Sequence, residues 1–336
     1  MAAHFPSPIS HLIFCLLLLL FCHLRLIAPA AHPNLPPQEV EALKKIQSKL
    51  GKTDWDFSKD PCSGQGNWSI HGVKGFESSV TCDCSFNNNS TCHIIRIALK
   101  SQNLSGIIPP EFSRLRHLQI LDLSRNFLSG SIPSQWATMQ LAELSVMGNR
   151  LSGPFPLVIT KITTLKNLSI EGNLFSGPIP SELGKLVRME RLHMSSNAFS
   201  GALPSELSNL TNLVDMRLSD NNLSGKIPSF IKSWEHIEKL HLQGTSLEGP
   251  IPSSISTLTK LTDLRITDLK GGHSLFPTLS DMGSIKTIIL RSCLLYGSIP
   301  EYIGEMKKLR TLDLSYNNLT GIIPSSFVQL GKADFL

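Results

Sequence analysis

Apolar residues recur along most of the chain in a pattern that repeats about every 24 residues. The stretch RLSDNNLSGKIPSF (217–230) shows the unit, and LDLSRNFLSGSIPS and LDLSYNNLTGIIPSS are near copies on either side of it. The copies align on the asparagine that ends LxLxxN, and this column, the ladder column, has a constant spacing of 24 residues except for one step of 23. Its ten members are Gln102, Asn126, Asn149, Asn173, Asn197, Asn221, Thr245, Leu269, Cys293 and Asn317. A fixed period over ten units predicts a solenoid.

Each recurring letter of the unit has a structural role in that interpretation. In the sixth unit, Leu213, Met216 and Leu218 are expected to point inward from a short strand whose alternate residues face outward. Asn221 ends the strand, where its amide can donate to backbone carbonyls that would otherwise be buried without a partner. No single coil can bury its apolar face alone, so stacked coils share one core. The pattern LxxLxLxxNxLSGxIPxxL predicts a leucine-rich-repeat solenoid, an α/β superhelix.

The later units depart from the pattern at the ladder column. Thr245 can still donate through its hydroxyl, whereas Leu269 cannot, and its unit gains Gly271-Gly272 and loses the GxIP segment. We therefore expect a break in the ladder at the eighth repeat. Cys293 occupies the same column, and a small, weakly donating thiol there is expected to be buried and unreactive.

A helical segment, LPPQEVEALKKIQSKLG (35–51), precedes the repeats. Its apolar positions share one face, prolines precede it and Gly51 ends it. Together with nearby tryptophans and cysteines it should form a cap, residues 32–93, over the first coil, followed by about ten repeats in 94–336. The sequence ends about one turn after the tenth strand, which predicts a truncated product without a C-terminal cap. The apolar face of the helical segment 35–51 consists of Val40, Leu43, Ile46 and Leu50.

The first 31 residues resemble a secretory signal peptide. LIFCLLLLLF (12–21) is a short apolar run followed by the small-residue pattern Ala28-Pro29-Ala30. An uncleaved anchor is the alternative. Export also sets the redox environment, since thiols oxidise outside the cell. We expect the cap cysteines to form two disulfides, in one of three pairings, with a zinc site that includes His93 as the rival interpretation. These cysteines are Cys62, Cys82, Cys84 and Cys92.

Eight Asn-x-Ser/Thr sequons indicate a glycoprotein. They are Asn67, Asn88, Asn89, Asn103, Asn167, Asn209, Asn222 and Asn318. The formal charge of +5 is too small and too dispersed to indicate a nucleic-acid partner.

The repeat segment LxGxIPxxL resembles that of the plant leucine-rich-repeat receptor-like serine/threonine kinases, whose repeats are the plant-type 24-residue form. The stretches DPCSGQGNW (60–68), VTCDCSFNNNSTCHI (80–94), IPPEFSRLRHLQILDLSRN (108–126) and GSIPSQW (130–136) are similar to one subgroup, in which a malectin-like domain, a membrane span and a kinase follow the repeats. The resemblance implies a receptor ectodomain on the extracellular side of the plasma membrane, or in the apoplast if the protein is secreted as it stands. Its implied partners are an extracellular peptide or carbohydrate and a receptor-kinase co-receptor. Contact with the membrane would come only through a C-terminal span that the sequence lacks.

The sequence holds no kinase motif, no HExxH, no GxSxG and no CxxC. We therefore expect neither enzymatic activity nor a cofactor or metal. Acid pairs such as Asp263 and Asp268 have arginine neighbours, so ion pairing explains them more simply than a hydrolase would.

The concave strand face is the expected recognition surface. Four residues before the ladder column, His193, Arg217, His241 and Arg265 form one row over repeats five to eight. Our hypothesis is a ligand-binding strip, with arginines for carboxylate or sulfate and histidines for pH-sensitive hydrogen bonds. The competing interpretation is a self-neutralising Arg/Asp surface with little net effect.

Two further features bear on this face. A glycan on Asn167, at the start of the fourth strand, would crowd the surface beside His193 and leave repeats five to nine free. Tyr316 is an outward aromatic, whereas Trp136 and Trp234 fall on connections and should be packed, so direct sugar stacking is weakly supported. Two functions remain: a receptor ectodomain, or a self-standing secreted repeat protein that acts as inhibitor, decoy or co-receptor partner.

Overall fold

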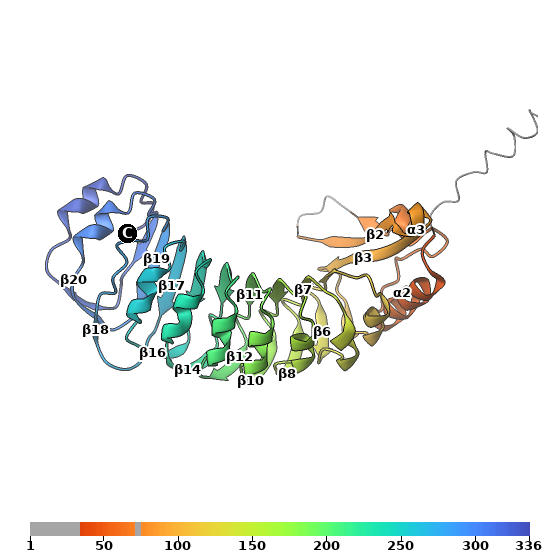
Figure 1. Ribbon diagram of the computed structural model, residues 1–336, viewed down its shortest axis with the longest axis horizontal. Coiled ribbons are helices and arrows are strands. Elements are labelled where there is room, and N and C mark those ends of the chain that lie inside the picture. Colours follow the sequence, from red (N-terminus) through yellow and green to blue (C-terminus); the bar gives the residue numbers. More distant parts are fainter. Residues whose placement is uncertain (1–33, 71–74) are drawn as a thin grey trace, which may run out of the picture.

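The computed structural model describes residues 34–70 and 75–336, and the predicted signal peptide lies outside these residues. The chain winds into a curved row of coils, with one long sheet on the inner, concave side (Figure 1). That sheet has twelve strands, and from β3 onward they are parallel, one per coil. Its strands are β1 (Ser69–Ile70), β2 (Glu77–Ser85), β3 (Thr91–Lys100), β5 (Ile120–Asp122), β7 (Glu143–Ser145), β9 (Asn167–Ser169), β11 (Arg191–His193), β13 (Asp215–Arg217), β15 (Lys239–Leu242), β17 (Asp263–Thr267), β19 (Thr287–Arg291) and β21 (Thr311–Asp313).

A second set of short strands follows the ladder column in each coil. They form a seven-stranded sheet and a separate three-stranded sheet. The first contains β4 (Ser105–Ile107), β6 (Phe127–Gly130), β8 (Arg150–Pro154), β10 (Leu174–Pro178), β12 (Ala198–Gly201), β14 (Asn222–Lys226) and β16 (Ser246–Glu248). The second contains β18 (Ser274–Leu275), β20 (Leu295–Ser298) and β22 (Asn318–Thr320).

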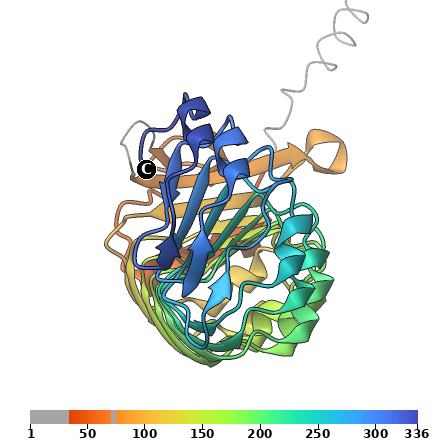
Figure 2. The same cartoon turned by 90° about the vertical axis from the view of Figure 1, so that its left-hand side faces the viewer.

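The segments that close the coils on their outer side are 3₁₀-helices of five residues, not α-helices. Each follows a proline in extended conformation, and a proline followed by so short a segment suits a single tight turn better than an α-helix. They are η2 (Pro110–Arg114), η3 (Ser134–Thr138), η4 (Leu157–Lys161), η5 (Ser181–Lys185), η6 (Ser205–Asn209), η7 (Ser229–Ser233), η8 (Ser253–Thr257), η9 (Glu301–Glu305) and η10 (Ser325–Gln329). Figure 2, which views the coils end-on, shows these turns stacked along one side.

The cap contains the predicted helix, α2 (Pro37–Leu50), which ends at Gly51 in a left-handed conformation. Its buried face differs from the predicted one: Glu39 and Ala42 are buried, and Val40 is only partly buried. Glu39 is buried because its carboxylate accepts from the backbone N–H of Ile94 (3.0 Å) and contacts His93. An ionised carboxylate can accept at both oxygens, so this one side chain joins the helix to β3.

Two disulfides, Cys62–Cys82 and Cys84–Cys92, hold the rest of the cap, so the zinc interpretation is wrong. The short elements η1 (Pro61–Ser63) and α3 (Phe86–Asn89) lie beside these bridges. Buried Trp55 and Trp68 pack with ring centroids 4.9 Å apart, and the apolar core continues without a gap from here into the coils.

The ladder forms as predicted in the regular coils, and Asn173 shows its geometry. Its Oδ1 accepts from the backbone N–H of Leu151 (3.1 Å). Its Nδ2 lies within hydrogen-bond distance of the carbonyls of Val146, Ile170 and Glu171 (3.0, 3.0 and 3.2 Å). One buried amide therefore ties neighbouring coils together, and this satisfies backbone groups that water cannot reach.

The ladder breaks where the sequence predicts. Leu269 is a buried apolar side chain in the ladder column, and the outer strands split there into two sheets, with Glu248 and Lys270 paired in an isolated bridge. Cys293 is also buried, and its thiol lies within donating distance of the carbonyls of Ile266 (3.2 Å) and Arg291 (3.4 Å). Burial raises the pKa of this thiol to about 12, which makes it the unreactive cysteine that the sequence predicts.

A membrane-spanning helix would need a longer apolar run than any helix in residues 34–70 and 75–336 provides. In the last coil, Phe335 bridges to Thr311 at the edge of the concave sheet.

Candidate ligand-binding strip on the concave sheet

The predicted row of residues is in register on the concave sheet. His193 pairs with Arg217 across β11 and β13, Arg217 with His241 across β13 and β15, and His241 with Arg265 across β15 and β17. All four side chains project from the same face because they occupy equivalent positions of parallel strands. We call this row, together with the residues bound to it, the strip.

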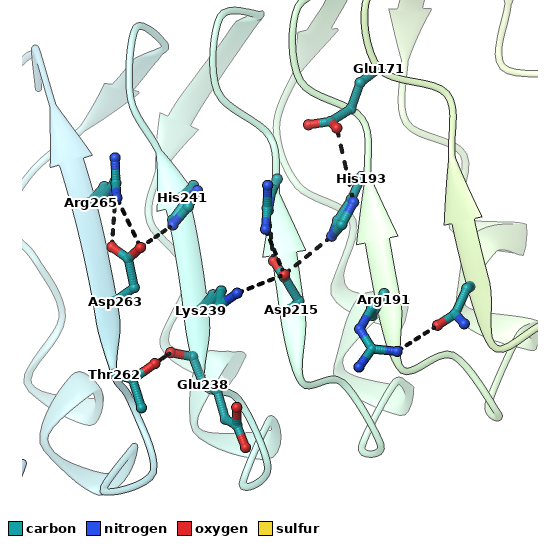
Figure 3. Close-up of polar contacts among 12 residues, drawn as sticks. Glu171, Arg191, His193, Asp215, Glu238, Lys239, His241, Thr262, Asp263 and Arg265 are labelled. Atoms are coloured by element: carbon teal, nitrogen blue, oxygen red, sulfur yellow. Dashed lines mark hydrogen bonds and ion pairs between the residues drawn. The ribbon is translucent and has the colours of Figure 1, made fainter. Parts of the chain in front are cut away.

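The row is not a line of free cations, because each arginine binds an aspartate of its own strand. Arg217 Nε and Nη2 donate to Asp215 Oδ1 and Oδ2, at 2.9 and 2.8 Å. On the other side of the same carboxylate, His193 Nε2 lies 3.3 Å and Lys239 Nζ 3.8 Å from Oδ2. Figure 3 shows Asp215 lying between His193 and Lys239. One buried carboxylate thus organises three basic side chains from three strands.

The same arrangement recurs two coils later. Arg265 Nε and Nη2 donate to Asp263 Oδ1 and Oδ2, at 2.7 and 3.0 Å, and His241 Nε2 lies 3.2 Å from Oδ2 (Figure 3). The two copies are called the first cluster (His193, Asp215, Arg217) and the second cluster (His241, Asp263, Arg265). Corresponding residues of the two are separated by 48 positions in sequence, two periods of the repeat.

The electrostatics fix both carboxylates in the ionised form. Burial by itself raises the pKa of Asp215, but the hydrogen bonds and charges of His193 and Arg217 outweigh burial and hold this pKa well below its usual range. At Asp263, burial also raises the pKa, and His241 and Arg265 outweigh it and lower the pKa to about 2. The bond to Asp215 raises the pKa of Arg217, which is opposed by burial.

Exposure divides each cluster into a buried anion and an accessible cation. The side chain of Asp215 is 6% exposed and that of Arg217 is 31% exposed. In the second cluster, the corresponding values are 17% for Asp263 and 35% for Arg265. Asp215 lies on the outward face of its strand, but the basic side chains around it cover its carboxylate. A molecule that approaches the strip therefore meets N–H donors.

A hollow of about 300 Å³ adjoins the strip over β3 to β11. Basic, acidic and uncharged polar side chains line it, among them Arg96, Glu143, Asn167, Arg191 and His193. Arg191 Nη1 lies 3.4 Å from Asn167 Oδ1, so the sequon asparagine is part of the wall of this hollow. A glycan on Asn167 would fill the hollow and leave the strip as the accessible part of the concave face.

The other sequence-predicted residues occupy consistent positions. Seven sequon asparagines are exposed, whereas Asn167 is half-buried. Trp136 and Trp234 are fully buried, as predicted for packed connections. Tyr316 is 75% exposed, and the guanidinium of Arg291 lies 4.4 Å from its ring centroid, so this ring is partly occupied by a cation.

Nothing in the described part of the chain forms a metal site, since no group of three or more His, Cys, Asp and Glu side chains is arranged to hold an ion. The His–Asp contacts of the strip lie on the surface of the concave sheet, where they hold charged hydrogen-bond donors in place. The chemistry available at the strip is binding through charged hydrogen bonds.

Sequence reasoning missed the clusters as units. The signal was present, because VDMRL (214–218) and TDLRI (262–266) both contain Asp-x-Arg at the start of a concave strand. Residues two apart on a strand lie on the same face, so each such pair can close a bidentate bond. What the sequence could not show is that the histidine of the preceding coil lies against the same carboxylate.

Comparison with known proteins identifies the class of the repeats. Six segments match the Leucine Rich Repeat family: residues 117–139, 164–186, 188–210, 212–234, 236–258 and 308–330. A probable LRR receptor-like serine/threonine-protein kinase from Arabidopsis thaliana is 63% identical over 136 residues, which are 40% of this chain and 13% of that protein. The chain therefore matches only a small part of this longer relative. The molecule is a leucine-rich-repeat solenoid whose repeats are related to those of plant receptor-like kinases.

Solved structures support the same class. The Arabidopsis receptor kinase HAESA, in complex with the peptide hormone IDA and the co-receptor SERK1, is 26% identical, with a TM-score of 0.61 over 86% of this chain and 55% of that one. A plant ice-binding protein is also 26% identical, with a TM-score of 0.66 over 87% of this chain and 90% of that one. The fold thus occurs both in a plant receptor kinase and in an ice-binding protein of similar extent.

Proposed function

We propose that the protein is the ligand-recognition ectodomain of a plant receptor-like kinase, on the extracellular side of the plasma membrane, and that the strip binds a peptide ligand. In a full-length receptor of the proposed subgroup, a malectin-like domain, a membrane span and a kinase would follow the repeats. The kinase activity would belong to that part, and the solenoid would supply recognition and contact with a co-receptor.

The observation that supports this proposal best is the register of the strip. Arg217 and Arg265 lie in register on a rigid sheet, each with a histidine, His193 or His241, on the strand before it, and on the face that is hollowed beside them. The aspartates hold these donors in place, so little conformational entropy is lost when a ligand binds. The structural likeness to a receptor kinase in complex with a peptide hormone supports a peptide as the class of ligand.

Ligand capture tests the proposal. The secreted protein is immobilised, incubated with apoplastic wash fluid, and the retained peptides are identified by mass spectrometry. The strip variant is Arg217→Ala/Arg265→Ala, and the matched control is Arg188→Ala, an exposed arginine in the connection before β11. We expect peptides that are retained by the wild type and the control and lost from the strip variant. Equal retention by all three proteins contradicts the proposal, as does the retention of no peptide.

A second function is favoured by one observation. The plant ice-binding protein matches this solenoid over 90% of its own length. Coils of about this number therefore make up most of a protein whose name refers to ice binding and not to a receptor. On this alternative the chain acts by itself as an inhibitor, a decoy or a co-receptor partner. Reading the genomic sequence downstream of Leu336 separates the two: an in-frame span and kinase supports the receptor, and a stop codon supports the secreted protein.

A further inference from the structure

The two clusters of the strip are copies of one another, and corresponding residues of the two lie two coils apart. Asp215 and Asp263 occupy equivalent positions on β13 and β17, and β15 lies between them. Neighbouring strands are about 4.8 Å apart, so equivalent atoms of the clusters lie about 9.6 Å apart along the solenoid. The concave curvature seen in Figure 1 brings the side-chain ends slightly closer than the strands themselves.

Each cluster offers a ligand the same chemistry. The aspartate is covered and fully engaged through Nε and Nη2 of its arginine, whereas Nη1 of Arg217 and of Arg265 makes no hydrogen bond within residues 34–70 and 75–336. Lys239, with a side chain 42% exposed, adds a further donor between the clusters. A matching ligand therefore presents two hydrogen-bond acceptors, and anionic acceptors bind a guanidinium most strongly.

The distance between the clusters limits the conformations in which a peptide could place one acceptor on each cluster. A polyproline-II segment rises about 3.1 Å per residue with three residues per turn, so residues i and i+3 lie on one side, about 9.3 Å apart. In a β-strand, residues i and i+3 lie on opposite sides, and the same-side pairs i,i+2 and i,i+4 lie about 6.7 and 13.4 Å apart. An α-helix offers i and i+7, about 10.5 Å apart, but as a cylinder about 10–12 Å wide.

We propose that the strip recognises an extended, polyproline-II-like peptide with acidic groups three residues apart, one seated on each cluster. This inference rests on the proposed function and specifies its ligand. The acidic group is a carboxylate or a sulfate, which present the same acceptor oxygens to an arginine. Polyproline II suits such a ligand because its backbone is already extended and loses little entropy on binding.

Fluorescent synthetic peptides test the spacing. The probes are proline-rich peptides of one composition with two glutamates two, three or four residues apart, a second set with sulfotyrosine in place of glutamate, and a helical peptide with glutamates seven residues apart. Binding is measured by fluorescence anisotropy at low salt. We expect the three-residue isomer to bind about tenfold more tightly than the two- and four-residue isomers, because it alone engages both clusters.

Variants connect this preference to the clusters. Asp215→Asn/Arg217→Gln and Asp263→Asn/Arg265→Gln each remove one ion pair as a unit, so neither partner is left as a buried charge on its own. Circular dichroism confirms that each variant is folded. We expect either variant to abolish the preference for the three-residue isomer, whereas Arg188→Ala retains it. If the three-residue isomer with glutamates binds more tightly, the preferred anion is a carboxylate, and if the one with sulfotyrosines does, it is a sulfate.

The inference is overturned if all isomers bind equally, if none binds, if the helical peptide binds best, or if the preference persists in either cluster variant. These outcomes are separable from a failure of the proposed function. A natural peptide retained in the capture experiment and lost from the strip variant would uphold peptide binding even where the three-residue spacing fails.

Discussion

Coils two to six and coils seven to nine stack into the same sheet, but they satisfy the backbone at the ladder column in different ways. In the earlier coils the concave strands β5 to β13 are three residues long, and an asparagine amide binds the carbonyls beyond each strand. In the later coils, where Thr245, Leu269 and Cys293 replace asparagine, β15 has four residues and β17 and β19 have five.

The difference teaches that longer strand pairing accompanies a weakened ladder, in which Thr245 and Cys293 donate in place of an asparagine amide and Leu269 cannot donate. Ile266, three residues before Leu269, pairs with Leu242 and Leu290 on the neighbouring strands. The Ile266 carbonyl has the weakly donating thiol of Cys293 beside it (3.2 Å), whereas the equivalent carbonyl in a regular coil, that of Ile170, lies within hydrogen-bond distance of the amides of Asn173 and Asn197. Backbone groups need a partner when buried, and a longer strand supplies it where the side chain cannot. The second cluster lies on these longer strands, so the strip continues where the ladder is weakened.

The largest effect is expected from removing a ladder asparagine in the regular coils. Asn173→Ala removes the acceptor of the buried Leu151 N–H, whereas the carbonyls of Val146, Ile170 and Glu171 keep other donors. The variant should lower the free energy of unfolding by roughly 2–3 kcal/mol, since one unpaired buried group costs about 1–3 kcal/mol and the hydrogen bonds of the amide are lost as well. The matched control is Thr245→Ala, which removes one hydrogen bond to Leu242 O (3.2 Å) and should cost about 1 kcal/mol. Urea denaturation followed by circular dichroism measures both. An equal decrease in the free energy of unfolding for both variants would show that the regular coils do not depend on the ladder more than coils seven to nine.

An intermediate effect is expected from Asp215→Asn, which removes the centre of the first cluster. The variant should be about 2 kcal/mol less stable at pH 5, because Arg217 keeps its charge without its partner. The folded-state pKa of Asp215 is depressed, so its contribution is present above the ordinary pKa of about 3.9 and is lost as the pH falls below that value.

The stability difference between wild type and Asp215→Asn should therefore be smaller at pH 3 than at pH 5. The wild type and the variant share the other charged groups around this position, His193, Lys239 and Glu171 among them, so the comparison isolates the Asp215 carboxylate. Thermal denaturation at the two pH values gives the difference, with exposed Asp281→Asn as the control. A difference that grows toward pH 3 would mean that Asp215 does not stabilise the fold as a carboxylate.

The smallest effect is expected at Cys293. Cys293→Ser keeps a small donor in the ladder column of a coil whose backbone is held by strand pairing, so its stability should stay within about 1 kcal/mol of the wild type. The thiol, with its pKa raised to about 12, should react with a disulfide reagent only after urea unfolds the protein. Rapid labelling of the folded protein would contradict a buried, structural role.

The sequence by itself determined the solenoid, its period, its cap and the residues that line the concave row. Periodicity does this because every inward leucine and every ladder residue must recur at the same place in each coil to share one core. It also located the irregular eighth repeat, since Leu269 cannot donate a hydrogen bond. The predicted helix face was less accurate, because Glu39 is buried through a bond to β3 that lies far away in the sequence.

Only the tertiary structure decided the character of the strip. The sequence shows His193, Asp215 and Arg217 as separate letters of two coils, and their charges alone suggest an exposed row of cations. Stacking brings His193 within 3.3 Å of Asp215 and covers the carboxylate with basic side chains. Contacts between coils depend on the strand register and on side-chain rotamers, and a repeat unit read one copy at a time specifies neither. The same stacking placed corresponding residues of the two clusters two coils apart, and that spacing defines the proposed ligand.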